Sequence, residues 1–174
     1  MIDYQSGYIL RPVNPTFIYF SLFCALLLNL LPIGNYSWAP DWLIICIVFW
    51  NIHQHRYVSV ILAFALGLMM DVHNSALLGL HAFSYSIVAY LAISWHRRII
   101  PLRVFSQALH LLPIFLFTAI FPVLVHWILR GEIFWWGLTG AFQALIEAML
   151  WPLATRILLA PQRRPIDVDH NRPI

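Results

Sequence analysis

The residues of this sequence that could do chemistry are a few acids set among long apolar stretches. Asp41 follows Pro40, and Asp71 ends an apolar run within GLMMDVHNSALLG at residues 67–79. Glu147 lies inside another apolar run. A carboxylate in such surroundings can accept hydrogen bonds from free backbone N–H groups, contact a partner, or carry a proton or ion across a membrane. Which role applies depends on the elements that hold each acid.

Motifs for other kinds of chemistry are missing from the sequence. The eight histidines show no HExxH or HxxxH spacing, so no metal ion is expected. The sequence has no P-loop, no GxGxxG and no Ser-x-x-Lys, and no nucleophile has an evident base partner. We therefore expect neither an enzyme nor a cofactor.

The composition indicates an integral membrane protein. Of 174 residues, 61% are hydrophobic and 10% are charged, and the mean hydropathy is +0.78. No water-soluble domain of this length could cover so much apolar surface, and the apolar runs are continuous rather than alternating. The predicted fold class is an all-α integral membrane protein with six transmembrane helices. All ten basic residues are arginines between apolar runs, a pattern typical of membrane orientation rather than nucleic-acid binding.

The chain divides into three parts. Residues 1–15 are expected to be a cytoplasmic N-terminal segment, 16–160 the six-helix membrane domain, and 161–174 a disordered cytoplasmic tail. The second and third spans are short, so we interpret 41–72 as a hairpin of two short or tilted spans. The six spans are expected at 16–33, 41–52, 57–70, 76–94, 106–129 and 133–159.

The arginines predict the orientation in the membrane. With six spans both termini lie on one side, together with every arginine except Arg130. The positive-inside rule makes that side cytoplasmic, so the turns at 34–40, 71–76 and 130–132 face the periplasm. A five-span arrangement would move only Arg11 across. The arginine count therefore supports six spans without excluding five.

Asp71 is expected at the outer end of the third span. Ala63, Gly67 and Asp71 recur every four residues and share one helix face. Small residues let a neighbouring helix approach closely, so the face that packs most tightly ends in a carboxylate. We interpret Asp71 as a polar lock between spans three and four. A contact with a partner and a role in proton or ion transport stay open as alternatives.

The lock would work through the start of the fourth span. Asp71 could accept hydrogen bonds from the backbone N–H groups at 76–78, where the helix dipole favours an anion. Asn74 or Ser75 could cap the same helix, and Gly79 would allow close contact one turn later.

Asp41 and Glu147 have structural interpretations as well. Asp41, after Pro40, can accept from the free N–H groups at the start of the second span, with a partner or ligand role as the alternative. An ionised Glu147 would be costly near the middle of the sixth span. A protonated Glu147, hydrogen-bonded within the bundle beside Gln143, is the preferred interpretation. A site that faces a partner helix, and a transport or ligand site, are the alternatives.

Two stripes of small residues are candidate docking faces for a partner helix. One is Ala63–Gly67 on the third span, and the other is Gly140–Ala144–Ala148 on the sixth. We expect one of the two to be used inside the bundle.

The order of these features resembles the bacterial rod shape-determining protein MreD family. The resemblance covers roughly residues 16–160. The matching pieces are PDWLIICIVFW at 40–50, GLMMDVHNSALLG at 67–79 and LWPL at 150–153. Carried onto this chain, the marked positions of the family are Pro40, Asp41, Gly67, Asp71, Gly79, Trp151 and Pro152.

The resemblance implies a non-enzymatic scaffold subunit of the cell-wall elongation complex. Such a protein lies in the bacterial inner membrane, crosses it several times with both termini cytoplasmic, and is needed for rod shape and lateral peptidoglycan synthesis. The implied partners are the bitopic protein MreC, with RodA, a class B penicillin-binding protein and MreB contacted directly or indirectly, besides membrane lipid.

Two other classes of protein compete with this interpretation. The family is similar to the six-helix substrate-binding subunits of energy-coupling-factor vitamin transporters, so a solute-binding subunit of a vitamin-type transporter is the alternative. It would need an outer cavity lined by residues such as Trp38, Asp41, Asp71 and His81. An intramembrane enzyme would need paired reactive groups, and the sequence offers none.

Overall fold

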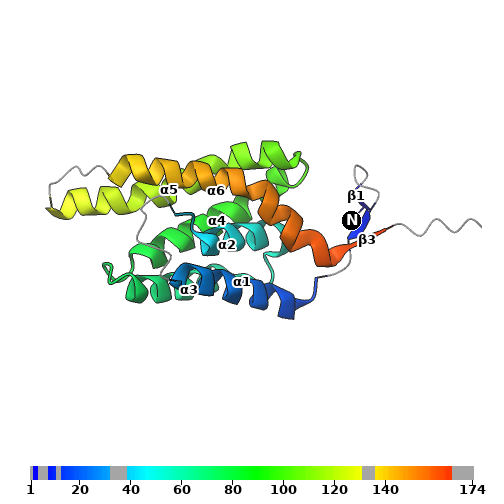
Figure 1. Ribbon diagram of the computed structural model, residues 1–174, viewed down its shortest axis with the longest axis horizontal. Helices are drawn as coiled ribbons and strands as arrows, with labels where there is room; N and C mark the ends of the chain where they lie inside the picture. Colours follow the sequence, from blue (N-terminus) through cyan, green and yellow to red (C-terminus); the bar gives the residue numbers. More distant parts are fainter. Residues whose placement is uncertain (1, 4–7, 11–12, 32–38, 131–135, 166–174) are drawn as a thin grey trace, which may run out of the picture.

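The described part of the chain is a bundle of six α-helices. The computed structural model describes residues 2–3, 8–10, 13–31, 39–130 and 136–165. In Figure 1, α5 and α6 lie side by side along one edge, α2 and α4 lie in the middle, and α1 and α3 lie along the opposite edge. The helices are α1 (Pro15–Leu30), α2 (Trp42–Gln54), α3 (Val60–His73), α4 (Leu80–Ile99), α5 (Val104–Arg130) and α6 (Trp136–Leu159).

Helix α2 forms the centre of the bundle. Nine of its 13 residues are buried, because it packs against α1, α4 and α6. A helix that is apolar nearly all round must be enclosed in this way. Although α2 and α3 follow each other in the sequence, α3 packs mainly on α4. The predicted hairpin at 41–72 therefore consists of two helices that each pack mainly on other neighbours.

The first three helices begin at polar caps. The side chains of Asn14, Asp41 and Ser59 each accept a hydrogen bond from a backbone N–H in the first turn of the helix that follows. A side-chain oxygen there satisfies one of the N–H groups that the helix leaves free.

Helix α4 begins later than predicted. The sequence predicts a start at residue 76, but the helix begins at Leu80 after Gly79, whose φ is +100°. Ser75 also has a positive φ of +50°. Both residues take left-handed conformations that interrupt a helix, so the apolar residues between them form a turn instead. Gly79 has no side chain to cap α4, and neither Asn74 nor Ser75 caps it, contrary to expectation.

Two helical segments among the described residues are long and apolar enough to cross a bilayer. They are Val104–Leu129 and Thr139–Gln162. Three further helices are apolar but shorter: Pro15–Leu30, Trp42–Gln54 and Val60–His73. At 1.5 Å per residue, a 13-residue helix such as α2 covers about 20 Å, less than a hydrocarbon core of about 30 Å.

The two ends of the chain pair with each other. A three-stranded antiparallel sheet joins β1 (Ile2–Asp3), β2 (Tyr8–Leu10) and β3 (Arg163–Pro165), and Ile9 lies opposite Arg164. The tail was expected to be disordered from residue 161, but a 3₁₀ turn at Ala160–Gln162 leads into β3. The sheet lies beside the C-terminal end of α6 (Figure 1). Pairing of β2 with β3 joins the two terminal segments through backbone hydrogen bonds.

Some sequence predictions lie outside the described residues. These are most of the turns at 34–40 and 130–132, Trp38, and the tail beyond residue 165.

Candidate functional site

Polar side chains from several helices meet around the start of α2. We call this group the Asp41 network. Asp41 is the residue before α2, and the other members come from α1, α4 and α6. The network comprises Asn29, Asp41, Tyr85, Gln143 and Glu147.

Asp41 uses both of its carboxylate oxygens. Its Oδ1 accepts from Asn29 Nδ2 at 2.6 Å and from the Ile44 N–H at 3.0 Å. Its Oδ2 accepts from the Tyr85 hydroxyl. Asn29 Oδ1 in turn accepts from the Trp42 N–H at 3.0 Å. The partial positive charge at a helix N-terminus favours an anion there, so one carboxylate both caps α2 and ties it to α1 and α4.

Glu147 joins α6 to the same point. Its Oε1 accepts from the Asp41 N–H at 3.1 Å and from Gln143 Nε2 at 3.0 Å. The side chain is fully buried, and Oε2 has no hydrogen-bond partner among the described residues. Both of these hydrogen bonds therefore end on the same carboxyl oxygen. An ionised group with one bare oxygen would be costly in this position.

Asp71 caps α4 from the neighbouring helix α3. Its Oδ2 accepts from the Gly79 N–H at 2.9 Å and the Ala82 N–H at 3.3 Å. Its Oδ1 accepts from the His81 N–H at 2.8 Å, and the ring nitrogen Nδ1 of His81 lies 2.8 Å away. The N–H groups involved therefore begin at residue 79 rather than at 76–78, because α4 starts after the turn. The N–H groups of His81 and Ala82 are among those that a helix leaves free at its start.

Gly67 lets α3 and α4 approach closely enough for these hydrogen bonds. A Cβ at Gly67 would lie 2.4 Å from Ala82 Cα and 2.6 Å from Ala82 N. The shared face of Gly67 and Asp71 therefore packs on the first turn of α4. Gly79 has a different role from the close contact expected of it, because a Cβ there would meet nothing within 4 Å. Its positive φ is what requires glycine.

Replacing Asp71 should lower the stability of the protein, and Asp71→Leu should lower it more than Asp71→Asn. Asp71→Leu removes the acceptor of the Gly79, His81 and Ala82 N–H groups, at about 1.5–3 kcal/mol for each charge-assisted hydrogen bond. Asp71→Asn keeps one acceptor oxygen but turns an NH₂ toward the other N–H groups, so we expect an intermediate loss. Thermal unfolding in detergent measures both. If both variants unfold like the wild type but lose a binding partner, Asp71 is a contact residue instead.

Trp151 joins α6 to α2 and α5. It is fully buried, and its Nε1 donates to Gln107 Oε1 at 3.2 Å. Its ring lies 6.0 Å from that of Phe49 and 6.4 Å from that of Phe115. Pro152 follows inside α6, where it has no N–H to donate and disfavours a straight helix. The contacts of Trp151 thus hold together the end of the bundle at which α5 begins and α6 ends.

Both small-residue stripes are used inside the bundle, whereas we expected one to be free. Gly67 lies against α4, and Ala63 is fully buried. Gly140 lies against Ala119 of α5, and Ala144 is fully buried. Neither stripe offers a face for a partner helix.

The Asp41 network and the hydrogen bonds of Asp71 connect helices of the chain to one another. Among the described residues, no group of three His, Cys, Asp or Glu side chains lies close enough to bind a metal ion. Asp41 and Asp71 each accept hydrogen bonds on both carboxylate oxygens from the chain itself.

Some members of these networks were missed by the sequence analysis. Asn29, Tyr85 and Gln107 carry no motif, and each is bonded to a residue far away in the sequence. A weak signal existed, since each is a polar residue within a mostly apolar helix.

These features define a class of protein: a small helical membrane protein whose buried polar groups bind its own helices together. The sequence profile of the family described as rod shape-determining protein MreD matches residues 10–161. The chain therefore belongs to the MreD family, as its sequence resemblance predicted, and this supports a role in rod-shape determination. A curated relative, the rod shape-determining protein MreD of Haemophilus influenzae, is 27% identical over 122 residues, which are 70% of this chain and 74% of the relative. No solved structure matches the chain.

Proposed function

We propose that this chain is a non-enzymatic scaffold subunit of the cell-wall elongation complex and binds MreC through its helices. Family membership supports this, and one structural observation carries it. The carboxylates of Asp41 and Asp71 are occupied within the chain, whereas an apolar groove between α1 and α3 is open. The connections between the described helices are short, so a partner must use helix faces for most of its contact area.

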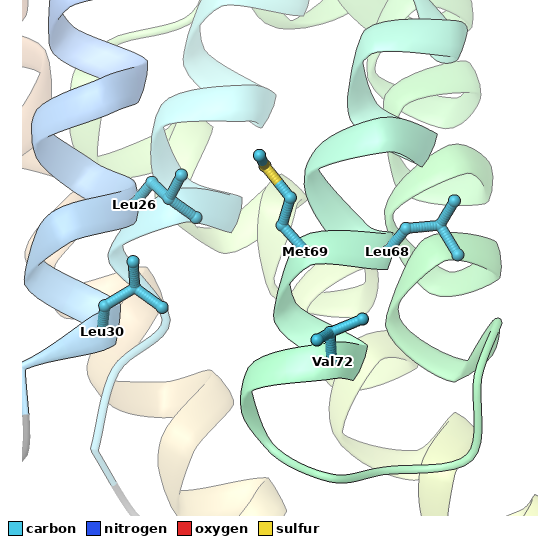
Figure 2. A pocket seen from close by; sticks show the side chains of 5 residues that line it. All are labelled: Leu26, Leu30, Leu68, Met69 and Val72. Carbon is cyan, nitrogen blue, oxygen red and sulfur yellow. The ribbon is translucent and has the colours of Figure 1, made fainter.

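The groove has the character of a site for another helix. Its volume is about 360 Å³, and Figure 2 shows Met69 reaching from α3 toward Leu26 and Leu30 of α1. Met69 is 57% exposed and Val72 is 69% exposed. Association of helices in lipid depends on van der Waals packing, which an open groove of this kind provides. The single transmembrane helix of the bitopic MreC is the occupant we propose. The lining residues are Leu26, Leu30, Leu68, Met69 and Val72.

Filling the groove should remove the partner without unfolding the protein. Met69→Trp places a large ring in the groove, where it should exclude a docked helix and reduce co-purification of MreC about tenfold or more, the effect of losing about 1.4 kcal/mol. Met149→Trp is the matched control, because Met149 is 80% exposed on α6. Both proteins are purified in mild detergent with MreC co-expressed. Equal recovery of MreC with the two variants would exclude this groove as the docking site.

The proposed topology is six spans with both termini cytoplasmic. The antiparallel pairing of β2 with β3 supports it, because it brings the two chain ends to the same end of the bundle. The distribution of arginines supports the cytoplasmic assignment. An impermeant thiol reagent, applied to intact cells with single cysteines at residues 3 and 35, distinguishes this topology from five spans by labelling only the latter position.

RodA, a class B penicillin-binding protein and MreB complete the proposed set of partners, bound directly or through MreC. The same purification identifies them. The likeness to vitamin-transporter subunits stays a prediction. The cavity it requires would include Trp38, which lies outside the described residues.

A further inference from the structure

Exposed arginines gather at one end of the bundle. Arg56 lies between α2 and α3, Arg97 and Arg98 lie in the last turn of α4, Arg103 precedes α5, and Arg156 lies in the last turn of α6. All are exposed. We call these side chains the arginine end.

Two contacts between helices fix this arrangement. The rings of His55 and His96 lie 5.1 Å apart, so the neighbouring Arg56 and Arg97 belong to one surface. The hydrogen bond from Trp151 to Gln107 joins antiparallel α5 and α6. Arg103 lies one turn before Gln107 and Arg156 lies just over one turn after Trp151, so both point to the same end.

The positive charge of the arginine end has no compensation within the described chain. None of its arginines forms an ion pair among the residues that the structure describes. The acids Asp41, Asp71 and Glu147 are each hydrogen-bonded elsewhere in the bundle. Uncompensated like charges at one surface attract anions from outside.

Aromatic residues place this surface at the level of lipid headgroups. Tyr57 is 39% exposed beside Arg56, and Trp95 is 36% exposed one turn or less from Arg97 and Arg98. Tyr and Trp side chains concentrate where a bilayer meets water. Guanidinium groups bind phosphate oxygens with paired hydrogen bonds. The anion that meets both conditions is the phosphate of an acidic phospholipid.

We propose that the arginine end is a binding surface for anionic phospholipid headgroups. It binds the phosphates of lipids such as phosphatidylglycerol, and it holds the α2–α3 and α4–α5 turns at the membrane surface. This role is separate from the groove between α1 and α3.

Native mass spectrometry of the detergent-solubilised protein, with phosphatidylglycerol or phosphatidylcholine added, tests the proposal. The wild type should bind the anionic lipid more tightly. The single variant Arg103→Gln should weaken the binding of the anionic lipid by about fivefold or less. The triple variant Arg97→Gln/Arg98→Gln/Arg103→Gln should weaken it by at least about fivefold. Arg130→Gln is the matched control, because it removes one charge at the opposite end of the same helix α5 and should have little effect. Phosphatidylcholine binding reports whether each variant is folded, and the single variant serves if the triple variant is not.

Four results would overturn the proposal. The first is equal binding of the two lipids by the wild type. The second is an equal loss with Arg103→Gln and Arg130→Gln. Displacement of the lipid by inorganic phosphate at similar concentration would indicate a site for a free anion. Capture of an acidic protein by the arginine end, without any preference between lipids, would indicate a protein interface.

Discussion

Gly67→Ala is expected to force α3 away from α4 and to destabilise the protein strongly. The new Cβ would lie 2.4 Å from Ala82 Cα, 2.6 Å from Ala82 N and 2.8 Å from the His81 carbonyl carbon. These are backbone atoms of a helix, so no side chain can rotate to relieve the contact. Overpacking alone costs about 1–3 kcal/mol, and any displacement of α4 also lengthens its hydrogen bonds to Asp71. We expect a total loss of about 3 kcal/mol or more.

Gly140→Ala is the control for this substitution. Its Cβ would lie 3.1 Å from Ala119 Cβ and 3.3 Å from Ala119 O, so a shift of a few tenths of an ångström accommodates it. Thermal unfolding in detergent should show a large decrease in the transition temperature for Gly67→Ala and a small change for Gly140→Ala. In cells depleted of the native protein, only Gly140→Ala should restore rod shape. Similar transition temperatures for the two variants would show that the approach of α3 to α4 is adjustable.

The sequence predicted the helices well because each contains a continuous apolar run. It also placed Gly67 and Asp71 on one packed face, since residues four apart share a face in any α-helix. The start of α4 was misplaced by four residues, from 76 to Leu80. Ala76, Leu77 and Leu78 are apolar enough for a helix, and nothing in their pattern reveals the positive φ angles of Ser75 and Gly79.

The Asp41 network could not be assembled from the sequence. Asp41 is separated from Asn29 by 12 positions, from Tyr85 by 44 and from Glu147 by 106. Periodicity reports which residues share a helix face, but it does not report which helices are neighbours. For the same reason the Gly140–Ala144–Ala148 stripe was recognised, while α5, the helix against which Gly140 packs, was not. The terminal strands of two or three residues are too short to leave an alternating pattern.

Asp41→Leu is expected to break the hydrogen bonds that tie α2 to its neighbours. Three donors lose their acceptor, and each lost hydrogen bond costs about 1 kcal/mol or more, so the free energy of unfolding should fall by at least about 3 kcal/mol. These donors are Asn29 Nδ2, the Ile44 N–H and the Tyr85 hydroxyl. Asp41→Asn should be much milder. Its oxygen can still accept from Asn29 and Ile44, and its NH₂ can donate to the Tyr85 hydroxyl oxygen, because a hydroxyl both donates and accepts.

A double-mutant cycle with Tyr85→Phe separates this structural role from a partner contact. If the Tyr85 hydroxyl stabilises the protein through Asp41, Tyr85→Phe should cost more in the wild type than in Asp41→Leu, with a coupling of about 0.5–3 kcal/mol. Thermal unfolding in detergent gives the four stabilities, and rod-shape restoration in depleted cells gives the functional effect. A stable Asp41→Leu protein that fails to restore rod shape would make Asp41 a contact with another subunit. Equal costs in both backgrounds would show that the hydroxyl and the carboxylate act independently. Loss of stability and of rod shape together, with both retained in Asp41→Asn, is the result expected if this carboxylate serves to hold α1, α2 and α4 in place.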